Sequence, residues 1–198
     1  MKAVSELPSG YEKICSVDLK ANKKLMILVN LFAIIIAAAL VIPMLFLVPI
    51  WNLFSMEAGF IPYILRFAAL AVFSVLYIIL HELVHGITMK LFGTKKVKYG
   101  FTGIYAFAGS DDYYGKIPYI VIALAPVVLW GIVLAIVTPL VPVEWFWVVY
   151  FIQISNLSGA AGDLYVTAKF LKLPKDILVK DEGVRMDVYS AVTLEKQL

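Results

Sequence analysis

The sequence predicts an all-α polytopic membrane protein with four transmembrane helices and a short β-hairpin or re-entrant loop after the second helix. Of its 198 residues, 62% are hydrophobic and 16% are charged, and the mean hydropathy is +0.91. A soluble domain usually contains about 45–50% apolar and about 25% charged residues. Four apolar runs reach the length of about 20 residues that a helix needs to cross a bilayer. These observations favour a membrane protein built from spanning helices.

The predicted spans follow one another with short connections, at about residues 25–50, 61–92, 117–140 and 145–171. Between the second and third spans, residues 96–109 alternate large apolar side chains with small or polar ones, and this period of two predicts the hairpin or re-entrant loop. The expected organisation is a cytoplasmic N-terminal segment at 1–24, a four-helix membrane domain at 25–171, and a cytoplasmic tail at 172–198.

The distribution of positive charge predicts the orientation. With both termini in the cytoplasm, all seventeen Lys and Arg residues except Arg66 lie inside or at the inner ends of helices. The positive-inside rule therefore favours an N-in, C-in topology in the plasma membrane, with the lipid bilayer as a partner. The sequence contains no basic patch interleaved with aromatic residues, so no nucleic-acid partner is expected. It leaves the oligomeric state open.

The second span carries His81, Glu82 and His85 in the pattern His-Glu-x-x-His. Histidines four residues apart project from one face of a helix, one turn from each other. Their nitrogens could therefore reach one Zn²⁺ at about 2.0–2.1 Å, and Glu82 could reach a water on the metal. This pattern is typical of zinc metallopeptidases, in which the glutamate is the general base. An ionisable residue inside a span is costly, which favours a functional site over a chance match.

A catalytic zinc usually has three protein ligands, and the chain has only two histidines, so we expect a carboxylate as the third. The candidates near the membrane are Asp111, Asp112, Glu144 and Asp163. The predicted topology places Glu144 at the outer face. It places Asp163 and His85 at a shared depth, roughly 8–9 Å from an inner-face lysine. Small residues before Asp163 allow close helix packing, so we favour Asp163, with Asp111 or Asp112 as the alternative.

The stretch His81-Glu82-Leu83-Val84-His85, together with Asn156-Leu-Ser-Gly-Ala-Ala-Gly-Asp163, resembles the site-2 protease class of intramembrane metalloproteases. More closely, it resembles the putative zincin peptidase family of small membrane proteins. The resemblance implies that His81, His85 and Asp163 bind Zn²⁺ and that Glu82 is the catalytic acid/base. It also implies that Asn156 contacts substrate, stabilises the oxyanion or orders the site, and that the loop at 96–109 presents substrate by strand addition.

The expected function is therefore that of a metalloendopeptidase of the site-2 protease type. It would use zinc to hydrolyse peptide bonds of membrane-protein or peptide substrates within or beside the membrane, near the cytoplasmic face. Two alternatives remain at this point. One is a non-proteolytic zinc-binding membrane protein with a structural or metal-handling role, and the other is an inactive membrane adaptor.

Overall fold

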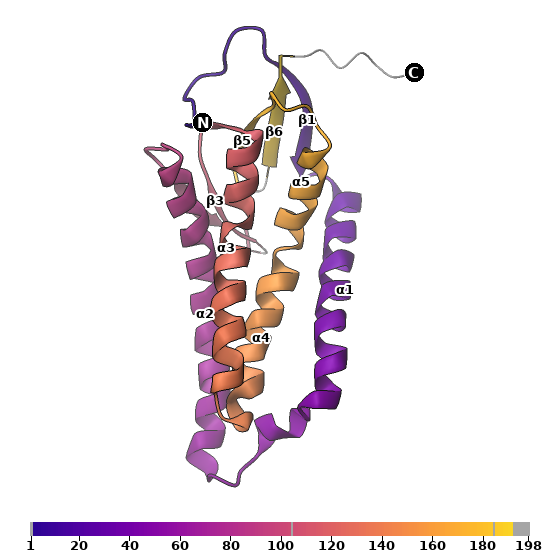
Figure 1. The fold of residues 1–198 in the computed structure, drawn as a ribbon, viewed down its shortest axis with the longest axis vertical. Helices are drawn as coiled ribbons and strands as arrows, with labels where there is room; N and C mark the ends of the chain where they lie inside the picture. The colour runs from indigo at the N-terminus through magenta and orange to yellow at the C-terminus, as the bar shows by residue number, and fades with distance from the viewer. Residues whose placement is uncertain (1, 104, 184, 192–198) are drawn as a thin grey trace. The chain divides into compact units, whose positions relative to one another are not determined.

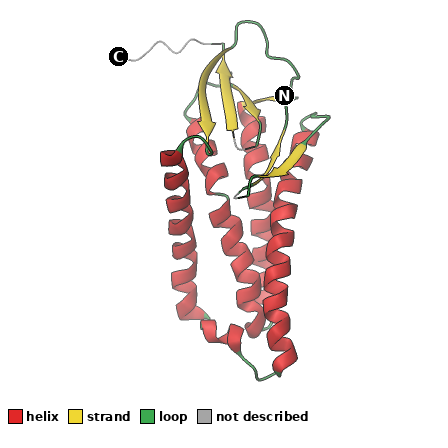
Figure 2. Cartoon of the chain, turned by 180° about the vertical axis from the view of Figure 1, so that it is seen from behind, coloured by secondary structure: helices red, strands yellow, loops and turns green. Residues whose placement is uncertain are grey.

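The computed structural model describes residues 2–103, 105–183 and 185–191, and it combines helices with two β-sheets (Figures 1 and 2). The expected all-α class is therefore wrong, and the fold is mixed. The reason lies in the N-terminal segment and the tail, which the sequence marked only as polar. They form strands β1 (Glu12–Asp18), β5 (Leu178–Asp181) and β6 (Arg185–Ser190), whose β-branched and aromatic residues suit a sheet.

Three helices of the described residues are long and apolar enough to cross a membrane, which suggests membrane association. They are α1 (Lys23–Leu47), α2 (Phe60–Leu91), and α3 (Lys116–Val137) extended by the 3₁₀ turn η2 (Thr138–Leu140). Large apolar side chains on their surfaces are exposed, among them Ile34 at 64% and Ile79 at 59%. Such broad apolar exposure is expected of surfaces that face lipid rather than water.

The predicted fourth span at 145–171 is not one continuous helix, which corrects the four-span expectation. It is divided at Ala160 into α4 (Val143–Gly159, 17 residues) and α5 (Ala161–Leu171, 11 residues). Gly159 and Gly162 flank the break, and glycine costs about 1 kcal/mol in a helix interior relative to alanine. Just before it, the Ser158 hydroxyl donates to the carbonyl of Ile154 at 2.7 Å, a bond that often bends helices.

The chain forms two compact units, each built from segments that are distant in sequence. We call Leu28–His81 with Pro126–Gly162 the helical unit, and Met1–Ile27 with Glu82–Ala125 and Asp163–Leu198 the sheet unit. Both α2 and α3 contribute residues to each unit.

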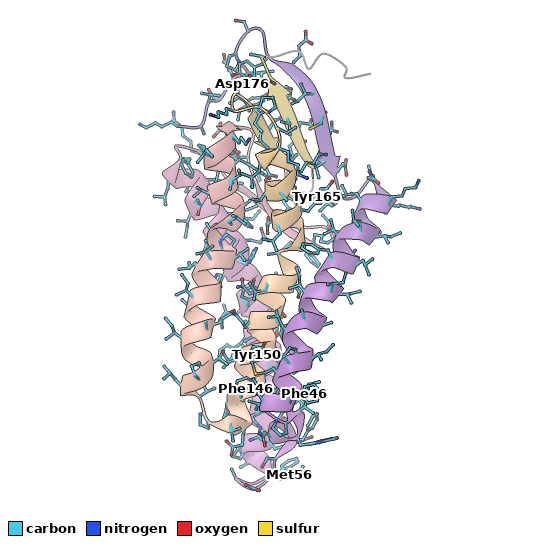
Figure 3. All side chains as sticks on the ribbon, turned by 45° about the vertical axis from the view of Figure 1, so that its right-hand side comes forward. Phe46, Met56, Phe146, Tyr150, Tyr165 and Asp176 are labelled. Carbon is cyan, nitrogen blue, oxygen red and sulfur yellow. The ribbon has the colours of Figure 1, made fainter. Side chains whose placement is uncertain are left out.

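Aromatic residues of α4 form the core of the helical unit. Trp147 is fully buried, and its Nε1 donates to the carbonyl of Val48 at 3.2 Å. The Tyr150 hydroxyl donates to the carbonyl of Leu40 at 3.0 Å, and its ring stacks on Phe146 with the centroids 5.3 Å apart (Figure 3). These contacts tie α4 to α1 and to the chain that follows α1.

Arg66 on α2 is also buried in the helical unit, at 1% exposure. Its Nε donates to the carbonyl of Leu53 at 3.1 Å, and its Nη2 donates to the carbonyl of Ser55. Leu53 belongs to the 3₁₀ helix η1 (Ile50–Phe54), and Ser55 is its C-terminal cap. The guanidinium is therefore held by carbonyl oxygens at the end of a short helix, where the backbone dipole favours a positive charge.

The sheet unit contains a four-stranded antiparallel sheet with the strand order β1-β6-β5-β4, in which β4 spans Tyr113–Gly115 (Figure 2). Strand β1 pairs with β6, with Ser16 opposite Asp187 and Val17 opposite Met186. Val17, Val179 and Val188 are fully buried. The sheet therefore buries apolar residues of the N-terminal segment and the tail, which were predicted from the sequence to be polar.

A polar cluster joins β1 to β6. Asp187 accepts from Lys13 Nζ at 2.7 Å, Ser16 Oγ at 2.7 Å and Arg185 Nε at 3.1 Å. Burial alone would raise the pKa of Asp187, but these donors outweigh it and hold the pKa at about 2. Ionised Asp187 therefore stabilises the pairing of the two strands near neutral pH.

The predicted hairpin at 96–109 is present as a separate two-stranded sheet of β2 (Lys98–Phe101) and β3 (Ala106–Gly109) (Figure 2). It is anchored on the β5–β6 turn, because the N–H of Ser110 donates to the carbonyl of Asp181 at 2.8 Å. Gly109 permits this approach. A Cβ there would lie 2.8 Å from the carbonyl carbon of Glu182 and 2.8 Å from the nitrogen of Gly183.

Candidate metal centre

Helix α2 carries the two histidines and Glu82. His81 is the last residue of α2 in the helical unit, and Glu82 is the first in the sheet unit. Since α2 is continuous, helix geometry sets His81 and His85 one turn apart on one face. Each histidine is only 9% exposed. A pair of buried imidazoles at this spacing can bind one metal ion from the same side of the helix.

Asp163 lies in the first turn of α5, because the break at Ala160 starts a new helix just before it. A carboxylate is favoured there by the N-terminal end of the helix dipole. Its Oδ2 is 3.8 Å from Nε2 of His85. One ligand atom from each of His81, His85 and Asp163 lies within 4.8 Å of the others.

The donor set fits zinc. Two imidazoles and one carboxylate are ligands of catalytic zinc sites, in which water takes the fourth position. With bonds of about 2.0–2.2 Å, the ligand atoms of a tetrahedral zinc lie about 3.3–3.6 Å apart. The 3.8 Å between His85 and Asp163 is therefore close to the spacing that a bound ion requires. The structure brings together the three residues expected as ligands, and their ligand role stays a prediction.

His85 is oriented by α3. Its Nδ1 lies 2.9 Å from the carbonyl oxygen of Ile122. A carbonyl only accepts, so Nδ1 carries the proton and Nε2 keeps the lone pair that a metal needs. The Ile122 carbonyl is available because the residue four positions later is Pro126, which has no N–H to donate back along the helix. A proline inside α3 thus provides the acceptor that fixes His85.

Glu82 projects from α2 towards the hairpin. It is partly buried, and the backbone N–H of Ala108 on β3 is close enough to act on its carboxylate electrostatically. Glu82 is also close enough to His85 and Asp163 to interact with them electrostatically. The acid/base role of Glu82 stays a prediction, and its position beside the histidines and β3 is what that role requires.

The other candidates for the third ligand lie elsewhere. Asp111 forms an exposed ion pair with Lys98 at 2.7 Å, with 67% of its side chain exposed. Glu144 is in the first turn of α4. Among the described residues, neither these two nor Asp112 belongs to the group that could hold a metal.

Asn156 is fully buried in the helical unit, and both polar atoms of its side chain have partners. Its Nδ2 donates to the carbonyl of Val127 at 3.1 Å, and its Oδ1 accepts from the Tyr77 hydroxyl at 2.9 Å. The Tyr77 oxygen is 2.8 Å from Nδ1 of His81. The sequence analysis did not single out Tyr77, although it precedes His81 by four residues and so shares its helix face.

Asp181 is a second residue that the sequence analysis missed. It is buried in the sheet unit, where Tyr119 Oη donates to its Oδ2 at 2.8 Å and the N–H of Gly183 donates to its Oδ1 at 2.7 Å. Burial raises the pKa of Asp181 to about 7, and the charges of Asp163 and Glu82 add to this rise. The sequence around Asp181 is typical of an ordinary charged turn, so it gives no indication that this aspartate is buried.

The residues of the site lie in a part of the chain that matches a known protein family. The family described as "Putative zincin peptidase" matches residues 74–178, which include all of the candidate ligands, Glu82 and Asn156. An "Uncharacterized 24.7 kDa protein in gap 5'region" from Pyrococcus woesei is 35% identical over 118 residues, which are 57% of this chain and 50% of that protein. The chain thus spans about half the length of this curated relative. No solved structure matches. The family match covers more than half of the chain and contains both motifs, and the chain therefore belongs to the putative zincin peptidase family.

Proposed function

We propose that this chain is a zinc-dependent endopeptidase of the site-2 protease type, which hydrolyses peptide bonds of membrane-protein substrates near the cytoplasmic face of the membrane. Family membership suggests metallopeptidase activity in general. The observation that carries the more specific proposal is the grouping of His81, His85 and Asp163, with Glu82 on the helix that bears both histidines. This is a complete set of groups for metal-assisted peptide hydrolysis.

The chain's own residues have distinct tasks in this reaction. When bound, zinc would polarise the peptide carbonyl and lower the pKa of a water towards about 7. Glu82 accepts a proton from the attacking water as the new C–O bond forms. It then donates that proton to the amine as the C–N bond breaks, so Glu82 ends in its starting state. Both histidines would hold the metal through Nε2.

The hairpin supports a role in substrate binding. On β3, the backbone N–H of Ala108 lies near the Glu82 carboxylate. In the described part of the chain, β2 pairs with β3 alone, so the other edge of β2 is open to an added strand. A substrate bound as an extended strand has its backbone unwound, and this is what hydrolysis of a membrane helix requires.

The proposed orientation places both ends of the described chain in the cytoplasm, on one side of the membrane, as the pairing of β1 with β6 in one sheet requires. All Lys and Arg residues except Arg66 then lie on the inner side, as the positive-inside rule favours. Arg66 does not weaken this assignment, because it is buried and donates to two backbone carbonyls rather than facing solvent.

The test compares wild type, Glu82→Gln and Asp163→Ala in liposomes, with zinc content measured on chelator-free protein. The probe is a pool of single-span peptides incubated in H₂¹⁸O, so that mass spectrometry identifies each new carboxylate by its ¹⁸O. We expect about one zinc in wild type and in Glu82→Gln, and loss of zinc in Asp163→Ala. Glu82→Gln should reduce cleavage by about 10²–10⁴-fold, the usual contribution of a general base.

Three outcomes would overturn the proposal. Wild type that contains no zinc would leave the adaptor alternative. Zinc whose removal lowers thermal stability, in a protein that cleaves none of the peptides, would favour a structural metal. Cleavage at the wild-type rate in Glu82→Gln would show that Glu82 is not the acid/base.

A further inference from the structure

We infer that Tyr77 is a positioning residue that, backed by Asn156, holds His81 in the tautomer with the proton on Nδ1. The inference rests on the proposed function only in that it gives this tautomer a purpose, which is to present Nε2 to the metal. Every residue in the argument belongs to the helical unit.

A backbone carbonyl, which can only accept a hydrogen bond, determines how the side chain of Asn156 is oriented. The oxygen of Val127 lies 3.1 Å from Nδ2 of Asn156. Since a carbonyl only accepts, the NH₂ group of the amide must face Val127. This settles the orientation of the Asn156 amide, which bond lengths alone leave open. The other end of the amide, Oδ1, then faces Tyr77 and can only accept.

The next step fixes the proton of Tyr77. Its hydroxyl oxygen is 2.9 Å from Oδ1 of Asn156, so the hydroxyl must donate to that atom. A phenol has one proton, and this bond uses it. The same oxygen is 2.8 Å from Nδ1 of His81. Two lone pairs at this distance would repel each other, so Nδ1 of His81 must donate to Tyr77.

Packing around this chain of hydrogen bonds prevents the amide from turning. Asn156 is fully buried, and Tyr77 and His81 are 8% and 9% exposed. The rings of Tyr77 and His81 meet edge to face, with centroids 5.6 Å apart. The amide is closely packed on the α3 side, where a Cβ at Gly131 would be in van der Waals contact with Nδ2 of Asn156 at 3.4 Å. Reversing the amide would leave a buried N–H group and a buried carbonyl facing the wrong partners.

The two histidines are therefore oriented in the same way by different means. His85 donates from Nδ1 to a helix carbonyl, and His81 donates from Nδ1 to a phenol. Neither uses a carboxylate, which is a common partner of metal-binding histidines. A neutral partner suits a membrane span, where an added negative charge is costly.

This arrangement assigns Asn156 a different task from stabilising the oxyanion. Its amide N–H group is already directed at Val127, away from Tyr77. Asn156 acts on the site through Tyr77, and its loss should affect the orientation of His81 first.

The test uses the fact that the chain has only two histidines. In metal-free protein labelled with ¹⁵N-histidine, NMR at pH 8 resolves the tautomer of each ring, because the ordinary histidine pKa is about 6.5. We expect both histidines of wild type to carry the proton on Nδ1. In Tyr77→Phe, His85 should be unchanged, and His81 should become a mixture of tautomers. Competition with a chelator should show zinc affinity reduced by about 10–100-fold, the usual effect of losing such a partner.

The matched control is Tyr150→Phe, which removes another hydroxyl of the helical unit, bonded to the Leu40 carbonyl at 3.0 Å. It should change neither tautomer nor zinc affinity. The inference is overturned if His81 of metal-free wild type carries its proton on Nε2, or if Tyr77→Phe leaves both the tautomer and the zinc affinity unchanged. The tautomers are measured without metal, so failure of the peptidase proposal would show separately, as absence of zinc or of cleavage in wild type.

Discussion

Replacement of Pro126 by alanine should make the protein more stable and a weaker zinc binder. Alanine brings back an N–H at this position, and the natural acceptor for it in the helix is the carbonyl of Ile122. That carbonyl now accepts from Nδ1 of His85 at 2.9 Å. In Pro126→Ala the two donors compete for one oxygen, and the helix donor has the better-defined geometry.

The size of each effect can be worked out separately. Proline in a helix interior costs about 3 kcal/mol relative to alanine. Weakening the hydrogen bond from His85 reduces this gain in stability by about 0.5–1.5 kcal/mol. The net gain in the free energy of unfolding should therefore be about 1.5–2.5 kcal/mol. Zinc affinity should fall by about 10–100-fold, because His85 loses the partner that fixes its ring.

The assay measures thermal unfolding of metal-free protein in detergent, together with zinc affinity by chelator competition. Pro43→Ala is the matched control, since Pro43 also lies inside a spanning helix, α1, and no histidine accompanies it. This variant should gain stability with unchanged zinc affinity. If Pro126→Ala binds zinc as tightly as Pro43→Ala does, the proline does not serve His85, and the reasoning is refuted.

Two further predictions concern the sheet unit. The pKa of Asp187 is about 2, below its value in an unfolded chain. Its stabilising contribution is therefore present above about pH 4 and is lost as the pH falls through about 2. Because its Lys and Arg partners are more than one-third exposed, we expect Asp187→Asn to lower the free energy of unfolding at pH 7 by only about 1 kcal/mol. The exposed Asp111→Asn should show no measurable change, and equal effects of the two variants would contradict the prediction. Gly109→Ala should cost about 1–3 kcal/mol, because its Cβ would meet backbone atoms of Glu182 and Gly183 at 2.8 Å. It should also slow cleavage by moving β3 away from Glu82. A Cβ at Gly159 would have nothing within 4 Å, so Gly159→Ala should be at least as stable as wild type. If Gly109→Ala is equally stable, the close approach at Gly109 is not required.

The features that the sequence predicted correctly are local ones. Helices α2 and α3 follow from the length of apolar runs, and the relation of His81 to His85 follows from helix periodicity within five residues. The hairpin at 96–109 follows from alternation with a period of two. Each of these signals lies within one stretch of chain, so no knowledge of distant contacts is needed.

The features that were missed depend on contacts between distant segments. Ser16 and Asp187 are 171 residues apart, and no sequence pattern in either strand indicates that the two strands pair. The break at Ala160 was hidden because the apolar run continues across it. The hydrogen bond between His85 and the Ile122 carbonyl depends on two features. Pro126 has no N–H to occupy that carbonyl, and α2 packs beside α3. Tyr77 is the exception, since its spacing from His81 was visible in the sequence.

The order of strands in the sheet unit also has a consequence for how the protein is made. Strand β1 leaves the ribosome first, and its partner β6 leaves only after every helix has been synthesised. During that time β1 has an unpaired edge, which is an aggregation hazard. Closing so long a loop is entropically costly and slow. The sheet that anchors the hairpin beside Glu82 is therefore completed after the helices have been made. The nascent chain would therefore lack the complete sheet, and with it the anchored hairpin beside Glu82, until β6 has been synthesised.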